Sequence, residues 1–341
     1  MQSDPPWRTA QALAAQGKVA EAADLLGKAA AGGDATAAFL RGLWRFEGRL
    51  VPRDLPGARA DIAAAADAGS RDAARAHAAL LANGAGAAPD WPAALAVLEA
   101  WAERDPVAQR QRALIAAMDL DADGAPRAVP AGEPLAQGDR VVRLPGLFSD
   151  DECRFLMEIV QARLQPAKIF HEQMQRFVRH PIRDSDAAGF PLLLEWPAVH
   201  ALNRRIAAAS ATDVAQGETL QILRYGPGQQ YKLHLDAMPE LENQRALTVI
   251  VYLNDGYEGG ETAFPELGLS VKGRRGDGLL FRNALPDGRP DPRSSHAGCP
   301  VGNGQKWIAS RWIRQSPPTR PGGFGPEEVE SGRERGGEAS R

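Results

Sequence analysis

The chain has 341 residues, of which 44% are hydrophobic and 24% charged, a composition ordinary for a globular protein in water. The net charge of −3 provides no electrostatic basis for binding nucleic acid or an anionic membrane, so neither partner is expected. The first residues lack the pattern of a secretory signal, and no apolar run approaches the ~18 residues of a membrane span. These absences favour a cytoplasmic location.

The two cysteines, Cys153 and Cys299, are too few for a disulfide framework. They could pair with each other in an oxidising compartment. In a chain without an export signal, we expect both to be buried, reduced thiols instead.

Residues 1–130 are rich in alanine and repeat with a period of 36. Positions one period apart carry the same residue type: Ala22, Ala58 and Ala94; Gly48 and Gly84; Asp54 and Asp90. Such a period predicts an all-α solenoid of helical pairs, each of which buries its apolar face against its neighbour. The pattern resembles the Sel-one-like branch of the tetratricopeptide-type repeats over about residues 10–120. A plain helical bundle is the alternative.

A Pro- and Gly-rich linker between residues 125 and 134 leads into a second domain, predicted to span residues 131–315. Val141–Leu144 is a short strand candidate. Ser149 and Glu152 form a capping box that predicts a helix of about four turns with Leu164 on its apolar face. Four further strand candidates then alternate with turn signals: Leu220–Tyr225, Ala246–Leu253, Gly278–Phe281 and Trp307–Ile313.

Several short strands with turns between them predict an antiparallel sandwich or barrel, so the fold class is α+β with two domains. The tail, residues 316–341, is rich in Pro, Gly, Glu and Arg and is predicted to be disordered.

The central chemical motif is His234-Leu235-Asp236. On a strand, alternate side chains share a face, so the imidazole and the carboxylate should point the same way. Two histidines and one carboxylate form a facial triad, which binds iron(II) and leaves coordination positions open for oxygen chemistry. His296 lies 60 residues after Asp236, just before a predicted strand, and is the natural third ligand.

The other histidines are weaker candidates because they fall in the repeats, in an irregular loop and in a predicted helix: His77, His171, His180 and His200. Lys306 follows His296 by ten residues and opens a predicted strand. A cation at the rim of an iron pocket can anchor the distal carboxylate of a dicarboxylic co-substrate.

Across about residues 138–315, the chain resembles the prolyl 4-hydroxylase branch of the iron/2-oxoglutarate dioxygenases. Six blocks agree in order and spacing: Tyr231–Asp236, Arg245–Asp255, Gly259–Pro265, Gly276–Phe281, His296–Val301 and Lys306–Trp307. The resemblance implies a double-stranded β-helix, or jelly roll, with flanking helices. It also implies Fe(II), 2-oxoglutarate and O2 as cofactors, with ascorbate as a candidate reductant.

The resemblance assigns roles to individual residues. His234, Asp236 and His296 match the metal ligands, and no catalytic residue beyond this metal centre is expected. Lys306 and Tyr231 match residues that hold the far carboxylate of 2-oxoglutarate. Further pocket-lining candidates are Thr248, Thr262 and Trp312.

The family's substrate loop corresponds to Ile169–Phe190, in which Arg183-Asp184-Ser185 matches an Arg-x-Ser element. Arg183 and Arg245 are therefore candidate substrate contacts. Arg245 has an alternative role, since it could instead pair with the acidic turn near it.

The predicted function is hydroxylation of a prolyl residue in a protein or peptide, with release of succinate and CO2. Stacked helical repeats form extended concave surfaces, which favours recruitment of a protein or Pro-containing peptide by the first domain. Two alternatives stay open: a free amino acid or small metabolite as substrate, and a non-catalytic interaction scaffold. Self-hydroxylation of the Pro-rich tail, at Pro317, Pro318 or Pro321, is a further hypothesis.

Overall fold

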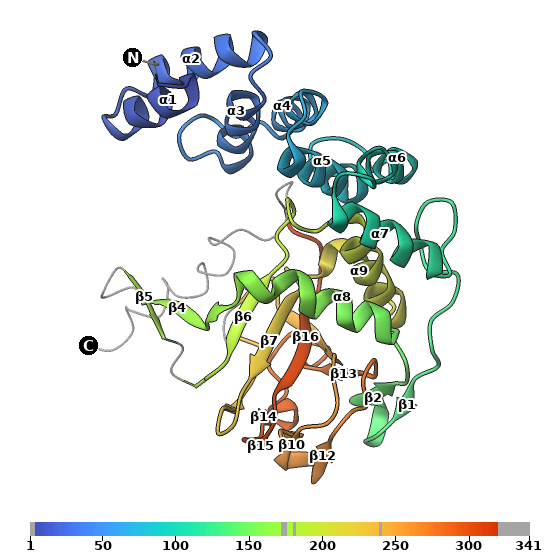
Figure 1. Ribbon diagram of the computed structural model, residues 1–341. Helices are drawn as coiled ribbons and strands as arrows, with labels where there is room; N and C mark the ends of the chain where they lie inside the picture. The colour runs from blue at the N-terminus through green and yellow to red at the C-terminus, as the bar shows by residue number, and fades with distance from the viewer. Residues whose placement is uncertain (1–3, 172–175, 180–181, 239–240, 320–341) are drawn as a thin grey trace, which may run out of the picture. The chain divides into compact units, whose positions relative to one another are not determined.

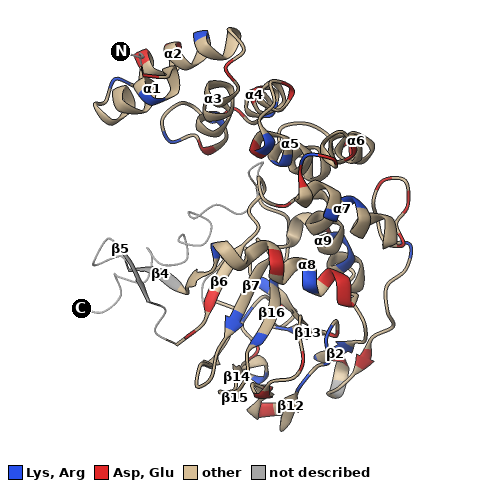
Figure 2. Cartoon of the chain, in the orientation of Figure 1, with Lys and Arg blue, Asp and Glu red and all other residues tan. Residues whose placement is uncertain are grey.

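The computed structural model describes residues 4–171, 176–179, 182–238 and 241–319, which belong to two compact units (Figure 1). Unit 1 comprises Met1–Ala125 and Pro191–Ala201, and unit 2 comprises Pro126–Phe190 and Leu202–Arg341. Residues of both signs of charge are interspersed along each unit (Figure 2). No helix in the described ranges is long and apolar enough to cross a membrane. Most of the tail predicted to be disordered, from residue 320 onward, lies outside the described residues.

Unit 1 is helical, and its helices recur at the period that the sequence predicts. Those described are α1 (Pro6–Ala15), α2 (Val19–Ala31), α3 (Ala35–Glu47), α4 (Leu55–Asp67), α5 (Arg71–Asn83), α6 (Trp91–Trp101) and α7 (Pro106–Ala117). Helices α2 and α4 start 36 residues apart, as do α3 and α5. The repeated alanines Ala22, Ala58 and Ala94 are fully buried, which allows neighbouring helices to approach closely.

The repeated glycines and aspartates mark the helix ends. Gly48 and Gly84 follow α3 and α5 with φ of 72° and 76°, the left-handed conformation in which a helix commonly stops. Asp54 and Asp90 cap α4 and α6, and each carboxylate accepts a hydrogen bond at 2.9 Å from the backbone N–H three residues on. The repeat in the sequence is therefore a repeat of start and stop signals.

Unit 1 also includes a segment from far along the chain, Pro191–Ala201. The side chain of Asn83 donates to the carbonyl of Leu192 at 2.9 Å. The N–H of Ala198 donates to the side-chain oxygen of buried Gln111 at 3.3 Å. Helices of the N-terminal region thus hold the first turn of α9 (Pro197–Ala209). The domain boundary near residue 130 stays a prediction, because the structure assigns this later segment to unit 1 as well.

Unit 2 contains the predicted antiparallel sheets. The larger sheet has the order β1 (Glu133–Pro134), β2 (Val141–Leu144), β13 (Gly278–Arg282), β9 (Arg245–Tyr252), β16 (Lys306–Arg314), β7 (Gln221–Tyr225), β6 (Asp186–Gly189) and β3 (Gln165–Pro166). The smaller has the order β12 (Leu269–Val271), β11 (Thr262–Phe264), β14 (His296–Gly298) and β8 (Tyr231–His234). Two further pairs are β10 (Glu258–Gly259) with β15 (Val301–Asn303), and β4 (Lys168–His171) with β5 (Arg176–Arg179).

The core of unit 2 joins side chains from both sheets. Strands of the larger sheet contribute every second residue, as the period of a half-buried strand requires. The buried cluster includes Leu223, Tyr225, Ile250, Tyr252, Phe264, Val271, Phe281 and Ile308. This packing fixes the inner faces of β7, β9 and β16 opposite those of β8, β11 and β14, which is the arrangement of a jelly roll.

The strands Val141–Leu144, Leu220–Tyr225, Ala246–Leu253, Gly278–Phe281 and Trp307–Ile313 were predicted within one residue at each end. The capping box at Ser149 and Glu152 is present, with Ser149 N–H donating to the Glu152 carboxylate at 2.7 Å. The helix it starts, α8 (Asp150–Val160), is shorter than predicted, because the chain tightens into a 3-10 turn and is extended at Leu164. His171 lies in β4 and not in an irregular loop.

The cysteines differ in environment. Cys153 is buried, and burial raises the pKa of its thiol to about 12. Cys299 is only half-buried, which corrects the prediction of a fully buried residue, and both thiols are unpaired.

Candidate active site

Three predicted metal ligands meet at the end of the smaller sheet. His296 begins β14, which pairs with β8 so that His296 lies directly across from His234. One possible ligand atom from each of His234, Asp236 and His296 lies within 4.8 Å of the others. The prediction that His234 and Asp236 share one strand was wrong, because β8 ends at His234 and Asp236 follows it. Its carboxylate still lies 3.5 Å from Nε2 of His234 and 3.7 Å from Nε2 of His296.

Backbone carbonyls orient both imidazoles. Nδ1 of His234 donates to the carbonyl of Lys232 at 2.8 Å, and Nδ1 of His296 donates to that of Ser294 at 2.9 Å. A neutral imidazole with its proton on Nδ1 presents a lone pair on Nε2, so both lone pairs are directed at the shared centre. Nε2 of His234 is buried and has no hydrogen-bond partner in the described part of the chain.

Charge in this cluster favours a cation. Burial acts to raise the pKa of Asp236, but the imidazoles of His296 and His234 and a hydrogen bond from Thr248 outweigh it and hold that pKa well below its usual range. Burial lowers the pKa of His296, so this imidazole stays neutral down to lower pH than an exposed one. Two neutral nitrogens and one carboxylate suit iron(II), with the remaining coordination positions open to other ligands.

A cavity adjoins these ligands. The predicted site residues that line it are Arg183, Tyr231, His234, Asp236, Thr248, Thr262, His296, Lys306 and Trp312. These residues come from distant parts of the sequence, so the folding of the two sheets brings them together.

Lys306 is a buried cation of this cavity. It is only 3% exposed, and its ammonium donates to the carbonyl of Gly260 at 2.7 Å. Gly260 has a φ of +69°, and a Cβ at this position would lie 3.2 Å from Cδ of Lys306, so glycine leaves room for the lysine stem. Burial lowers the pKa of Lys306 to about 8. The group has spare donor capacity for a carboxylate oxygen.

Two tyrosines occupy different places in the cavity. The ring of Tyr231 stacks on the ring of His234, with centroids 3.6 Å apart. Tyr225 instead pairs with Lys306 across β7 and β16, and the ammonium lies 5.8 Å from its ring centroid. The sequence interpretation missed Tyr225. Its inward position follows from the alternation along the predicted strand Leu220–Tyr225, and that signal could have identified it.

Thr262 and Trp312 also face the cavity. Thr262 shares a hydrogen bond of 3.0 Å with the buried hydroxyl of Tyr252, which fixes it in place. Nε1 of Trp312 is buried without a hydrogen-bond partner in the described residues, so one donor beside the cavity is available to a ligand.

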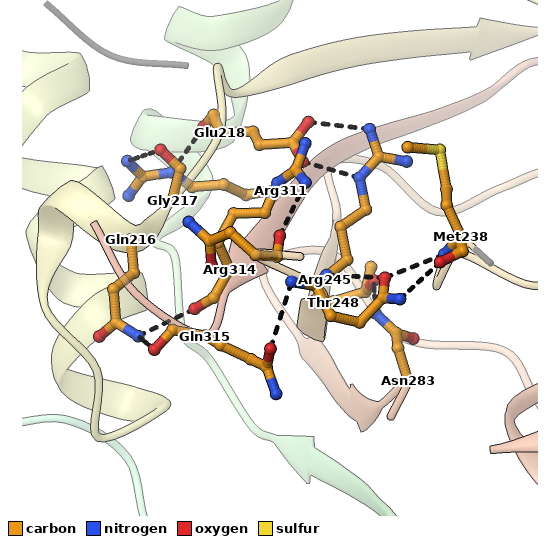
Figure 3. A network of polar contacts seen from close by, with 12 residues as sticks. Gln216, Gly217, Glu218, Met238, Arg245, Thr248, Asn283, Arg311, Arg314 and Gln315 are labelled. Atoms are coloured by element: carbon orange, nitrogen blue, oxygen red, sulfur yellow. Dashed lines mark hydrogen bonds and ion pairs between the residues drawn. The ribbon is translucent and has the colours of Figure 1, made fainter. Parts of the chain in front are cut away.

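The two predicted substrate arginines differ. Arg183 lines the cavity, with its guanidinium 5.6 Å from the ring centroid of Tyr231. Arg245 instead makes two hydrogen bonds to Glu218, at 2.7 and 2.9 Å (Figure 3). Its guanidinium also lies over the ring of Trp312, 4.0 Å from the centroid. Its partner is therefore Glu218, 27 residues earlier, and not the acidic turn near it. Part of the predicted substrate loop, residues 172–175 and 180–181, lies outside the described residues.

An antiparallel jelly roll that carries a His-x-Asp…His triad and a buried lysine in one cavity defines the class of iron(II) oxygenases that use 2-oxoglutarate. Comparison with known proteins agrees: residues 220–314 match the family model of the 2OG-Fe(II) oxygenase superfamily. Prolyl 4-hydroxylase 1 of Arabidopsis thaliana is 36% identical over 203 residues, which cover 54% of this chain and 71% of that protein. Prolyl 4-hydroxylase subunit alpha-1 of Gallus gallus is 33% identical over 196 residues, or 53% of this chain and 38% of the relative.

Among solved structures, the 2OG complex of a viral collagen prolyl hydroxylase from Paramecium Bursaria Chlorella virus-1 is 28% identical, with a TM-score of 0.42 over 53% of this chain and 99% of that one. The chain belongs to the prolyl 4-hydroxylase family of 2OG-Fe(II) oxygenases. It is a 2-oxoglutarate-dependent dioxygenase, and its cofactors are Fe(II), 2-oxoglutarate and O2.

Proposed function

We propose that this dioxygenase hydroxylates a prolyl residue of a protein or peptide at C4, with release of succinate and CO2. One observation carries the proposal: the His-Asp-His cluster and the buried Lys306 border the same cavity in a chain 36% identical to a prolyl 4-hydroxylase. The similarity to prolyl 4-hydroxylases supports the substrate class, and the residues of the cavity support the catalytic chemistry.

We assign the metal to His234, Asp236 and His296, and the distal carboxylate of 2-oxoglutarate to Lys306. Tyr225, which lies across from Lys306, is the better placed tyrosine to share that carboxylate, and Tyr231 is assigned to the wall beside His234. When bound, iron(II) and 2-oxoglutarate together activate O2 for oxidation of a C–H bond. The chain's own contribution is to orient the ligands and to exclude water from the cavity.

Burial supports the orienting role of these residues. Asp236 and His296 are each 4% exposed, and the carbonyls of Lys232 and Ser294 fix the direction of both imidazoles. Burial also raises the pKa of Tyr231 to about 12 and raises that of Tyr225, so both phenols keep their protons at neutral pH and can donate hydrogen bonds.

For unit 1, we propose recruitment of the protein or peptide substrate. Helices that repeat with a fixed period suit extended chains, because each repeat adds a similar surface to the next. A free amino acid or small metabolite needs no such surface, so this second candidate substrate is included in the experiment below.

The substrate class is tested by incubating the full-length protein with Fe(II), 2-oxoglutarate, ascorbate and either Pro-rich peptides or free L-proline. We expect peptide to gain one oxygen atom per succinate formed, detected by mass spectrometry, with the new hydroxyl on proline C4. Oxygenation of L-proline but of no peptide would replace the peptide proposal by the small-molecule one. Succinate formation without any oxygenated product would leave the cofactor assignment intact and contradict both substrate classes.

The pH dependence of co-substrate binding follows from Lys306. Its pKa of about 8 means that the ammonium is mostly charged at pH 7 and mostly neutral at pH 9. A neutral amine cannot pair with a carboxylate, so the affinity for 2-oxoglutarate should fall as pH rises, by about tenfold between pH 7 and pH 9. Calorimetric titration of the metal-loaded protein measures this. An affinity that stays constant across that range would contradict the assignment of Lys306.

A further inference from the structure

Asn283 is a fully buried amide directly after β13, close to the metal ligands but not one of them. Its side-chain Nδ2 donates to Oγ1 of Thr248 at 2.8 Å. The hydroxyl of Thr248 in turn donates to Oδ2 of Asp236 at 2.7 Å. Figure 3 includes the contact between Thr248 and Asn283. Two hydrogen bonds therefore connect the amide to the carboxylate ligand.

The chemistry of the groups fixes the direction of this chain. A threonine hydroxyl has one hydrogen, and a carboxylate can only accept, so the hydrogen of Thr248 must point to Asp236. The oxygen of Thr248 is then an acceptor that needs a donor in a buried place. The amide of Asn283 provides that donor, and consecutive hydrogen bonds of one direction strengthen each other.

The backbone of Asn283 is held from both sides. Its N–H donates to the carbonyl of Ala246 at 2.8 Å, which ties it to β9 beside Thr248. Its carbonyl accepts from the N–H of Asp291 at 2.9 Å. The carbonyl of Asp291 in turn accepts the hydroxyl hydrogen of Ser294 at 2.7 Å. Ser294 is the residue whose own carbonyl orients the imidazole of His296. The backbone of Asn283 is thus anchored to β9 on one side and, through Asp291, to the segment that precedes His296 on the other.

We propose that Asn283 is a positioning residue that acts through Thr248 to fix the orientation of the Asp236 carboxylate, and thereby the affinity of the site for its metal. The inference rests on the metal assignment made above. Asn283 touches neither metal nor substrate, so its effect must appear in metal binding itself and must disappear when Thr248 can no longer transmit it.

The test is a double-mutant cycle on metal binding by the full-length apoprotein, titrated with Co(II) and followed by calorimetry and visible absorption. Asn283→Leu removes the donor at similar volume, and Thr248→Val removes the hydroxyl isosterically. Partners beyond the ligands themselves contribute about 10- to 100-fold to metal affinity, and we expect each single variant to lose that much. The double variant should bind only as weakly as Thr248→Val alone.

Matched controls separate this effect from general damage. Asn303→Leu changes an exposed asparagine whose side chain accepts from the neighbouring N–H of Gly304, and this variant should bind Co(II) as the wild type does. His296→Ala should lose binding. Thermal unfolding of each apoprotein shows whether the variant is folded. If Asn283→Leu does not fold, Thr248→Val still tests the inference, because wild-type metal affinity in Thr248→Val would overturn it.

Three results would overturn the inference. Wild-type affinity and an unchanged Co(II) spectrum in Asn283→Leu would show that the amide does not position the carboxylate. Losses that multiply in the double variant would show that Asn283 acts independently of Thr248. If the wild type binds Co(II) no more tightly than His296→Ala, the metal assignment itself is wrong. This third result therefore marks failure of the proposed function, whereas the first two mark failure of this inference alone.

Discussion

Replacing His296 by alanine is expected to reduce conversion of 2-oxoglutarate to succinate by more than about 100-fold. Outer partners of metal ligands already contribute about 10- to 100-fold, so loss of a ligand itself must cost more. His296 is buried, lies across from His234 in the paired strands, and has its Nε2 3.7 Å from the carboxylate of Asp236. No other histidine among the described residues belongs to this ligand cluster. Succinate release under air, with and without Fe(II), measures the effect.

The matched control is His77→Ala, because His77 is a half-buried histidine in α5 of the helical unit. It should keep wild-type succinate release per folded molecule. Iron-dependent turnover that survives in His296→Ala would refute the ligand assignment. Equal loss in both variants, with lowered unfolding temperatures, would instead mean that the histidine changes act on stability.

Replacing Lys306 by alanine should raise the KM for 2-oxoglutarate by about 100- to 4,000-fold while Fe(II) binding changes little. Removing one partner of a buried ion pair costs about 3–5 kcal/mol, and each 1.4 kcal/mol corresponds to about tenfold in affinity. Lys306 is 3% exposed and is the lysine among the side chains that line the cavity. The variant is measured by 2-oxoglutarate titration of succinate release, together with Co(II) binding.

Lys28→Ala removes a lysine whose side chain is 74% exposed on α2, and it should leave both quantities unchanged. A KM within about threefold of wild type in Lys306→Ala would place the 2-oxoglutarate carboxylate elsewhere, with Arg183 the next candidate in the cavity. Loss of Co(II) binding in Lys306→Ala would show that the lysine supports the metal centre and not only the co-substrate.

The local signals of the sequence predicted much of this protein. Periodic residues repeat along the chain, so the helical character and 36-residue period of unit 1 could be predicted from sequence, and five strands of unit 2 could be located. The His-x-Asp motif and the lysine ten residues after His296 could also be recognised, because each lies within a short segment of the sequence. These features are predictable because hydrogen bonding and burial within one element are determined by residues close in sequence.

Other features depend on which strands and helices pack together. The pairing of β8 with β14 brings His296 opposite His234, and that of β7 with β16 brings Tyr225 opposite Lys306. Long-range contacts likewise decided that Arg245 pairs with Glu218 and that Asn283 reaches Asp236 through Thr248. A single sequence states the charge and hydrogen-bonding capacity of each such residue. The partner of such a residue is determined only when two surfaces pack together, because every buried polar group between them then needs a hydrogen-bond partner.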